Sequence, residues 1–116
     1  FSGANNPLYL IRNNELIEHK GDKMPIGIHD RANLSFSNKI IQIEDDDCIY
    51  LFSDGFADQF GGIKGKKYMY KKFKEFFLSI HQKSMAEQQE LFAQESINWR
   101  GHLDQIDDQI IMGIKI

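Results

Sequence analysis

Several residues that mark particular classes of protein are scarce in this sequence. Its 116 residues include one cysteine, two prolines and one tryptophan. The single cysteine, Cys48, excludes an intrachain disulfide, and its place in an apolar run fits core packing in a reducing compartment. We therefore expect a cytoplasmic protein.

The sequence also lacks a long apolar run and a strong excess of charge. No stretch approaches the roughly 20 apolar residues of a membrane-spanning helix. The 14 basic and 17 acidic residues give a formal net charge of −3 without a basic block. We expect neither nucleic-acid binding nor membrane contact by these residues, and a membrane anchor elsewhere in a parent protein would be compatible with them.

The length fits one folded unit. With 41% of apolar residues, the chain can form one modest domain or part of a larger one. It begins at Phe1, inside a segment with the character of a strand and without a leader sequence. We expect it to be a portion cut from a longer chain.

Turn formers and apolar periodicity predict the strands. Asn13 and Asn14 tolerate the positive φ of a tight turn, which predicts a β-hairpin from residues 7–12 and 15–20. Glycine and proline then predict a loop through about residue 34. Three further strands are predicted, over residues 38–44, 47–53 and 109–116. The strand over 47–53 should be covered on both faces, and the strand over 109–116 should be half-buried.

Two helices are predicted before the last strand. Residues 68–81 place apolar side chains at helical spacing with lysines between them. Ser84 and Glu87 form the pattern of a capping box, and Gly101 is expected to end the second helix. We therefore predict an α+β fold in which two helices pack on one face of a mainly antiparallel sheet.

The residues that could carry chemistry lie at the ends of two predicted strands. Asp54 directly follows an apolar strand, and Gly55 lets the chain turn sharply after it. Asp107 and Asp108 stand at the start of the last strand. If the two strands are neighbours, Asp54 and one of this pair converge, and close carboxylates need a compensating cation. Oxygen ligands favour Mg²⁺ or Mn²⁺, whereas scattered histidines and one cysteine do not suggest zinc.

Less specific explanations exist for each of these aspartates. An Asp-Gly pair at a strand end is often only a turn. Asp107 could equally be a solvated residue at the start of a strand, or it could neutralise a nearby lysine. The spacing alone therefore leaves the function open.

The order of motifs along the whole chain is more specific than either pair alone. In sequence these are Gly3-Ala4-Asn5-Asn6-Pro7-Leu8, Met24-Pro25-Ile26-Gly27, an acidic turn, Ser53-Asp54-Gly55, two helices and Asp107-Asp108. This order resembles the C-terminal half of the bacterial SpoIIE and RsbU-like phosphatases of the PPM superfamily, the protein phosphatase 2C type. The resemblance implies part of an αββα sandwich, with residues 1–116 as the C-terminal portion of the domain and the N-terminal portion absent.

The resemblance also assigns residues to a metal site. It implies that Asp54 and Asp107 are metal ligands, that Gly55 serves the turn, and that Asp108 supports its neighbour. Asp58 matches an acidic position where glutamate is more usual, and we expect it to have a structural role.

Three departures from the family pattern limit what the chain can do by itself. The Gly3-Ala4 pair stands where relatives often have Gly-His, so any contact from that histidine is absent. Ser53 replaces a frequent threonine, which is a mild change. The family's first half contributes a further aspartate that bridges two metals, and nothing in this chain matches it.

The implied activity is that of a protein serine/threonine phosphatase. In the complete domain two Mn²⁺ or Mg²⁺ ions activate a water that attacks the phosphorus in line, and no side chain of this portion takes part directly. The implied partners are a phosphoserine or phosphothreonine protein, such as an anti-sigma-factor antagonist in bacterial signalling, and a sensor domain on the same parent chain. The isolated portion is expected to be inactive.

Two other functions stay open. The domain could be a non-catalytic regulatory module, a pseudophosphatase, or a structural domain that binds a divalent ion and is unrelated to phosphatases.

A glycine-containing loop after Asp54 carries Lys64, Lys66 and Lys67. This loop could contact a phosphoprotein substrate or could simply be solvated.

Overall fold

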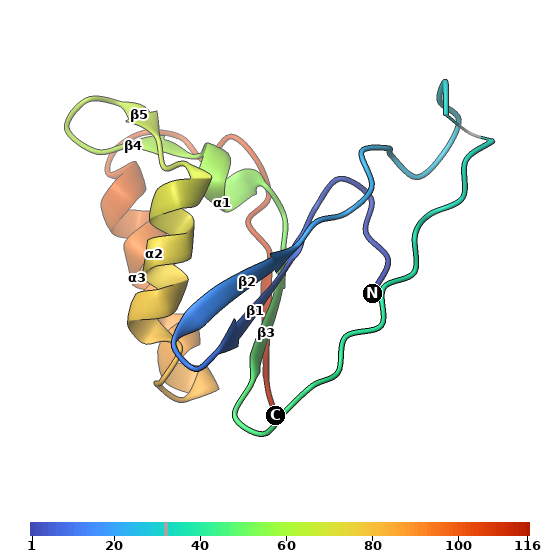
Figure 1. Cartoon of the computed structure of the whole chain (residues 1–116). Coiled ribbons are helices and arrows are strands. Elements are labelled where there is room, and N and C mark those ends of the chain that lie inside the picture. Colours follow the sequence, from blue (N-terminus) through green and yellow to red (C-terminus); the bar gives the residue numbers. More distant parts are fainter. Residues whose placement is uncertain (32) are drawn as a thin grey trace.

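A four-stranded antiparallel sheet organises the chain. The computed structural model describes residues 1–31 and 33–116, with the helices gathered on one side of the sheet (Figure 1). The strand order is β2-β1-β3-β6, formed by β1 (Leu8–Arg12), β2 (Glu15–His19), β3 (Cys48–Phe52) and β6 (Ile111–Lys115). The predicted hairpin, the strand predicted over residues 47–53 and the closing strand are therefore confirmed.

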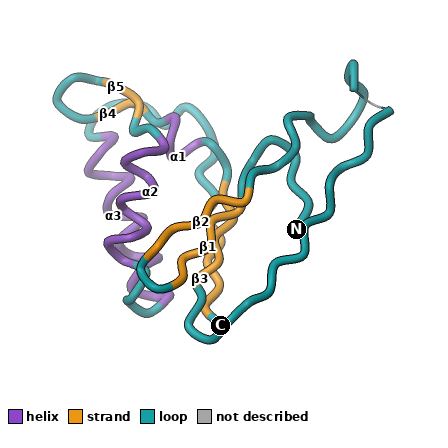
Figure 2. Tube along the Cα trace, in the orientation of Figure 1, coloured by secondary structure: helices purple, strands orange, loops and turns teal. Residues whose placement is uncertain are grey.

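The helices form a second layer against this sheet (Figure 2). They are α1 (Gly55–Asp58), α2 (Tyr70–Ile80) and α3 (Met85–Arg100). The capping box at the start of α3 is present, because Ser84 Oγ accepts from the Glu87 backbone N–H and the Glu87 carboxylate accepts from the Ser84 backbone N–H. Gly101 ends α3 with a φ of +57°, as the sequence predicts. Among the described residues, no helix has the length and apolar character needed to span a bilayer.

Two short elements do not appear in the prediction. One is α1, which continues the turn after β3. The other is a small hairpin of β4 (Phe60–Gly61) and β5 (Lys66–Lys67), which lies within the predicted glycine and lysine loop. Both are too short to show an apolar period in the sequence, so only the fold reveals them.

An aromatic cluster joins the sheet to the helices. Phe77 of α2 is fully buried, and its ring lies 4.5 Å from the Tyr50 ring on β3 and 4.9 Å from the Phe92 ring on α3. Tyr9 on β1 also packs on Phe77, with 5.7 Å between ring centroids. One α2 side chain therefore contacts two central strands and the neighbouring helix, and such aromatic pairs are worth about 0.5–1.5 kcal/mol beyond their burial.

The opposite face of the sheet is open, which corrects one prediction. β3 was expected to be covered on both faces, yet Leu51 is 38% exposed while its neighbours Tyr50 and Phe52 are buried. On β6, Met112 and Ile114 are likewise about half exposed. The reason is that α2 and α3 lie on one side, and no described residue forms a layer on the other (Figure 1).

The strand predicted over residues 38–44 is wrong. This segment runs outside the sheet, and Ile40 is 93% exposed. Its isoleucines have the pattern of a strand, but a strand needs a hydrogen-bonded neighbour to be stable. Lys39 exchanges backbone hydrogen bonds with Phe1, and the segment forms no ladder within the described part of the chain.

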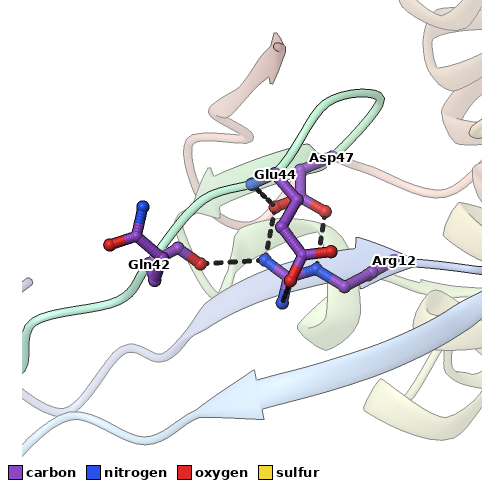
Figure 3. Close-up of polar contacts among 4 residues, drawn as sticks. All are labelled: Arg12, Gln42, Glu44 and Asp47. Carbon is purple, nitrogen blue, oxygen red and sulfur yellow. Dashed lines mark hydrogen bonds and ion pairs between the residues drawn. The ribbon is translucent and has the colours of Figure 1, made fainter.

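A charged cluster fixes the start of β3 to the end of β1 (Figure 3). The Arg12 guanidinium donates to both carboxylate oxygens of Asp47, at 2.9 and 2.7 Å, and pairs with Glu44 at 2.8 Å. Asp47 is only 1% exposed. Hydrogen bonds from Arg12 lower the pKa of Asp47, although burial acts in the opposite direction. A buried carboxylate is thus held ionised by a bidentate partner.

We expect Arg12→Leu to lower stability most at neutral pH. The lowered pKa of Asp47 means that its stabilising effect is complete above the pKa of the unfolded carboxyl, about 3.9, and is lost as the pH falls through the lower pKa of the folded carboxyl. Urea unfolding midpoints of parent and variant should therefore differ clearly at about pH 7 and less at about pH 3. Glu44→Gln, at a more exposed carboxylate, should have a smaller effect. An equal difference at both pH values would contradict this account.

Candidate metal centre

The pairing of β3 with β6 brings the predicted metal ligands to one end of the sheet. The strands are antiparallel neighbours, and Phe52 at the end of β3 lies opposite Ile111 at the start of β6. Asp54 follows one strand at this end, and Asp107 and Asp108 precede the other. The condition on which the convergence of these aspartates depends, that the two strands are neighbours, is therefore met.

Ser53 extends this pairing beyond the strand ends. Its backbone N–H donates to Ile110 O at 3.0 Å, and its hydroxyl donates to Asp108 O at 2.8 Å. The same hydroxyl oxygen accepts from the Ile110 N–H at 3.0 Å. These bonds fix the residue before Asp54 to the residue after Asp107. A threonine would keep the hydroxyl, so the serine preserves the contact.

Gly55 allows the two segments to touch. A Cβ at this position would lie 2.2 Å from the Asp108 carbonyl oxygen and 2.9 Å from its carbon. Gly55 also opens α1 and is buried. Its φ is not positive, so the absence of a side chain is required by the close approach of the Asp107-Asp108 segment and not, as the sequence suggested, by the turn.

The two candidate ligands are exposed aspartates on fixed backbone. Asp54 is the N-cap residue of α1, and its side chain makes no capping hydrogen bond. Asp107 accepts the backbone N–H of Asp108 at 2.8 Å through one carboxylate oxygen. The carboxylates of Asp54 and Asp58 are close enough to Tyr70 to raise its pKa, after the larger effect of burial. The site is thus negatively charged.

The two aspartates are the type of ligand that a hard divalent ion prefers, but they are too few to complete a metal site. Carboxylate oxygens are the ligands that Mg²⁺ and Mn²⁺ prefer. Within residues 1–31 and 33–116, however, no three His, Cys, Asp or Glu side chains are grouped so that they could hold a metal. Asp54 and Asp107 would therefore supply part of a site that further ligands complete.

Asp58 and the predicted lysines belong to the same end of the molecule. Asp58 in α1 pairs with Lys67 of β5 at 3.3 Å. Lys64 and Lys66 are exposed on the β4–β5 hairpin. Lys67 is therefore engaged in holding the hairpin to α1, whereas the side chains of Lys64 and Lys66 extend into solvent.

Two residues near the site were missed by sequence reasoning. Gln59, directly after α1, is 1% exposed, and its side-chain amide donates to Asp104 O at 2.8 Å. Trp99 on α3 donates through Nε1 to Gln59 O at 2.8 Å. Neither belongs to a motif or an apolar period that points to the site, so the sequence carries no signal for these contacts.

Comparison with solved structures identifies the class of fold. The SiaA-PP2C domain of Pseudomonas aeruginosa matches with a TM-score of 0.91 and 28% identity, over 100% of this chain and 45% of that one. The phosphatase domain of the cell fate determinant SpoIIE from Bacillus subtilis, in a crystal form without domain swapping, matches with a TM-score of 0.64 and 19% identity, over 98% and 47%. A second structure of that domain gives 0.59 and 17%, over 97% and 49%.

The fold is therefore that of PP2C-type phosphatase domains, and the chain spans about half the length of the structures it matches. At their low identity the two Bacillus subtilis structures support the fold alone. The family model of Stage II sporulation protein E (SpoIIE) matches residues 1–116, so the chain belongs to the SpoIIE family. No curated protein matches the sequence.

We expect Gly55→Ala to disturb both stability and the site. The added methyl group meets backbone rather than a flexible side chain, so the Asp107-Asp108 segment must shift. Overpacking of this kind costs about 1–3 kcal/mol, measured as the free energy of urea unfolding. Gly113→Ala is the matched control, because the atoms nearest to its Cβ would belong to the side chains of Met85 and Tyr50, at 3.1 Å, and not to backbone. Equal losses in the two variants would show that the contact with Asp108 is not special.

Proposed function

We propose that this chain forms the C-terminal half of a metal-dependent protein serine/threonine phosphatase domain, with Asp54 and Asp107 as ligands of Mn²⁺ or Mg²⁺. The observation that carries the proposal is the joining of the two aspartate-bearing segments by Ser53 and Asp108. Membership of the SpoIIE family and the PP2C-type fold support the reaction class.

The residues of this chain would hold the metal ions and would not react with the substrate themselves. Two bound ions would supply an activated water and would neutralise phosphate oxygens. Asp54, at the N-cap of α1, and Asp107, before β6, would each offer carboxylate oxygens to the ions. Ser53 and Gly55 keep the two backbones together, and no side chain of this chain is assigned a proton transfer.

The chain alone is proposed to be inactive. It spans about half of the matched phosphatase domains, and the described residues provide no third metal-ligating side chain beside the two aspartates. Two carboxylates should hold a divalent ion only weakly, because further ligands are needed to fix its geometry. A second candidate function, a non-catalytic regulatory module, is favoured by Ala4, which stands where relatives often have histidine.

The partner proposed for the active form is a phosphorylated protein. Family membership favours a role in bacterial signalling, with an anti-sigma-factor antagonist as the substrate and a sensor domain on the same polypeptide. A cytoplasmic location would fit both this role and the single buried cysteine, Cys48.

The test is hydrolysis of phosphoserine peptides by the complete product of the gene that encodes these residues. We expect Mn²⁺-dependent release of phosphate, and a loss of at least about a hundredfold in Asp54→Ala and Asp107→Ala. The 116-residue chain alone should release little or none. Circular dichroism would show that the variants are folded.

A folded complete protein that is inactive with several phosphopeptides and metals would favour the regulatory module. Activity that survives in Asp54→Ala would remove Asp54 from the site. Metal-dependent turnover by the 116-residue chain alone would contradict the proposed incompleteness.

The lysines of the β4–β5 hairpin provide a separate prediction. If they contact a phosphoprotein, Lys64→Glu and Lys66→Glu should raise KM in the complete protein and leave kcat nearly unchanged, because both side chains are exposed. Lys67→Glu should in addition lower stability, since Lys67 pairs with Asp58. An unchanged KM in the first two variants would mean that the hairpin is only solvated.

A further inference from the structure

Gln59 is a buried amide between the two segments that carry the aspartates. It follows α1 directly, and its side chain is 1% exposed. A glutamine is seldom buried so completely, and burial of an amide is tolerated only when its hydrogen bonds are made. Its partners therefore show which parts of the chain it joins.

The amide of Gln59 reaches both ends of the loop that holds Asp107. Its Nε2 donates to Asp104 O at 2.8 Å and to Phe60 O at 3.0 Å. Its Oε1 accepts from Gln109 Nε2 at 3.3 Å. The assignment of nitrogen and oxygen is unambiguous, because the two carbonyl groups can only accept hydrogen bonds.

The partners of Gln59 are themselves fixed. Gln109 accepts a hydrogen bond from Ser96 of α3. The backbone carbonyl of Gln59 accepts from Trp99 Nε1 and from the Tyr68 N–H. The loop of residues 104–109 is therefore connected on one side to the end of α1 and on the other to α3. None of these hydrogen bonds of Gln59 goes to either candidate ligand.

We propose that Gln59 is a positioning residue that holds the Asp107 loop at a fixed place relative to Asp54. The inference rests on the proposed function, in which both aspartates bind the same metal centre. Residues that orient metal ligands from outside the site typically change metal affinity by 10- to 100-fold when they are replaced. A neutral amide suits this task, because it donates to two carbonyl groups and also accepts, which a carboxylate cannot do.

The chain contains a matched control for this residue. Gln88 of α3 is 2% exposed, and its Nε2 donates to the carbonyl groups of His81 and Lys83, while its Oε1 accepts from the Tyr50 hydroxyl. It has the same residue type, burial and set of hydrogen bonds as Gln59, but none of its partners lies in the Asp107 loop. Gln59→Met and Gln88→Met therefore remove equivalent interactions at different places.

The experiment uses the complete product of the gene that encodes these residues, and it has two readouts. The first is amide hydrogen exchange without metal at Asp108 and Ile110, whose N–H groups bond to Asp107 Oδ1 and Ser53 Oγ. The second is titration with MnCl₂, followed by paramagnetic broadening of the amide signals around Asp54 and Asp107, which detects weak binding. Both variants and the parent are compared, with stability measured separately by urea unfolding.

We expect Gln59→Met to speed exchange at Asp108 and Ile110 and to weaken Mn²⁺ binding by at least about tenfold. Gln88→Met should lose similar stability but leave both readouts unchanged. Should Gln59→Met fail to fold, Gln59→Asn keeps a neutral amide on a side chain too short to reach the same carbonyl groups, and it should give the same result.

Unchanged exchange at these amides in the Gln59 variants would overturn the proposal, as would equal weakening of Mn²⁺ binding in Gln88→Met. A parent chain that shows no Mn²⁺ broadening around Asp54 would count against the metal assignment itself. In that case faster exchange in Gln59→Met would still support its role in holding the loop, and unchanged exchange would reject it. Failure of the proposed metal site and failure of the proposed role of Gln59 are thus distinguishable.

Discussion

The structure depends on the antiparallel pairing of β3 with β6. This pairing joins segments that are far apart in sequence, since Ser53 and Asp108 are separated by 55 positions and still share a hydrogen bond. Closing so long a loop is entropically unfavourable, and it must be offset by contacts that form together with it. The ladder of β3 and β6, the approach of Gly55 to Asp108 and the amide of Gln59 all act at the same end of these two strands.

The aromatic cluster also helps to offset the entropic cost of closing this loop. Phe77 packs on the rings of β1 and β3 and on Phe92, so α2 and α3 hold the centre of the sheet from one side. The far side has no such cover among the described residues, and Leu51 and Met112 stay partly exposed there. Such a face is what a second sheet would cover in the αββα sandwich that the family resemblance implies.

The sequence predicts those parts of the fold whose signals are local. The hairpin at Asn13-Asn14, the capping box at Ser84 and the period of α2 each depend on neighbouring residues, and each is confirmed. The segment around Ile40 is different. Its apolar pattern is that of a strand, but whether a strand forms depends on a partner strand, and Ile40 is exposed. In the same way, Asp54 and Asp107 stand out in motifs, but Gln59 contributes only through distant contacts that no local pattern encodes.

Backbone groups and carboxylate side chains have different roles at the candidate site. Ser53, Gly55 and Gln59 all act on backbone groups of the opposing segment, through the carbonyl groups of Asp108 and Asp104. By contrast, the carboxylate of Asp54 makes no capping hydrogen bond, and Asp107 uses one oxygen for the adjacent N–H. If Asp54 and Asp107 bind a metal ion, as proposed, the ion competes poorly with strong internal hydrogen bonds to them. It is then favourable to fix these residues through their backbone and to leave their carboxylate oxygens available. This arrangement explains how exposed aspartates can be held in place without being neutralised by the protein itself.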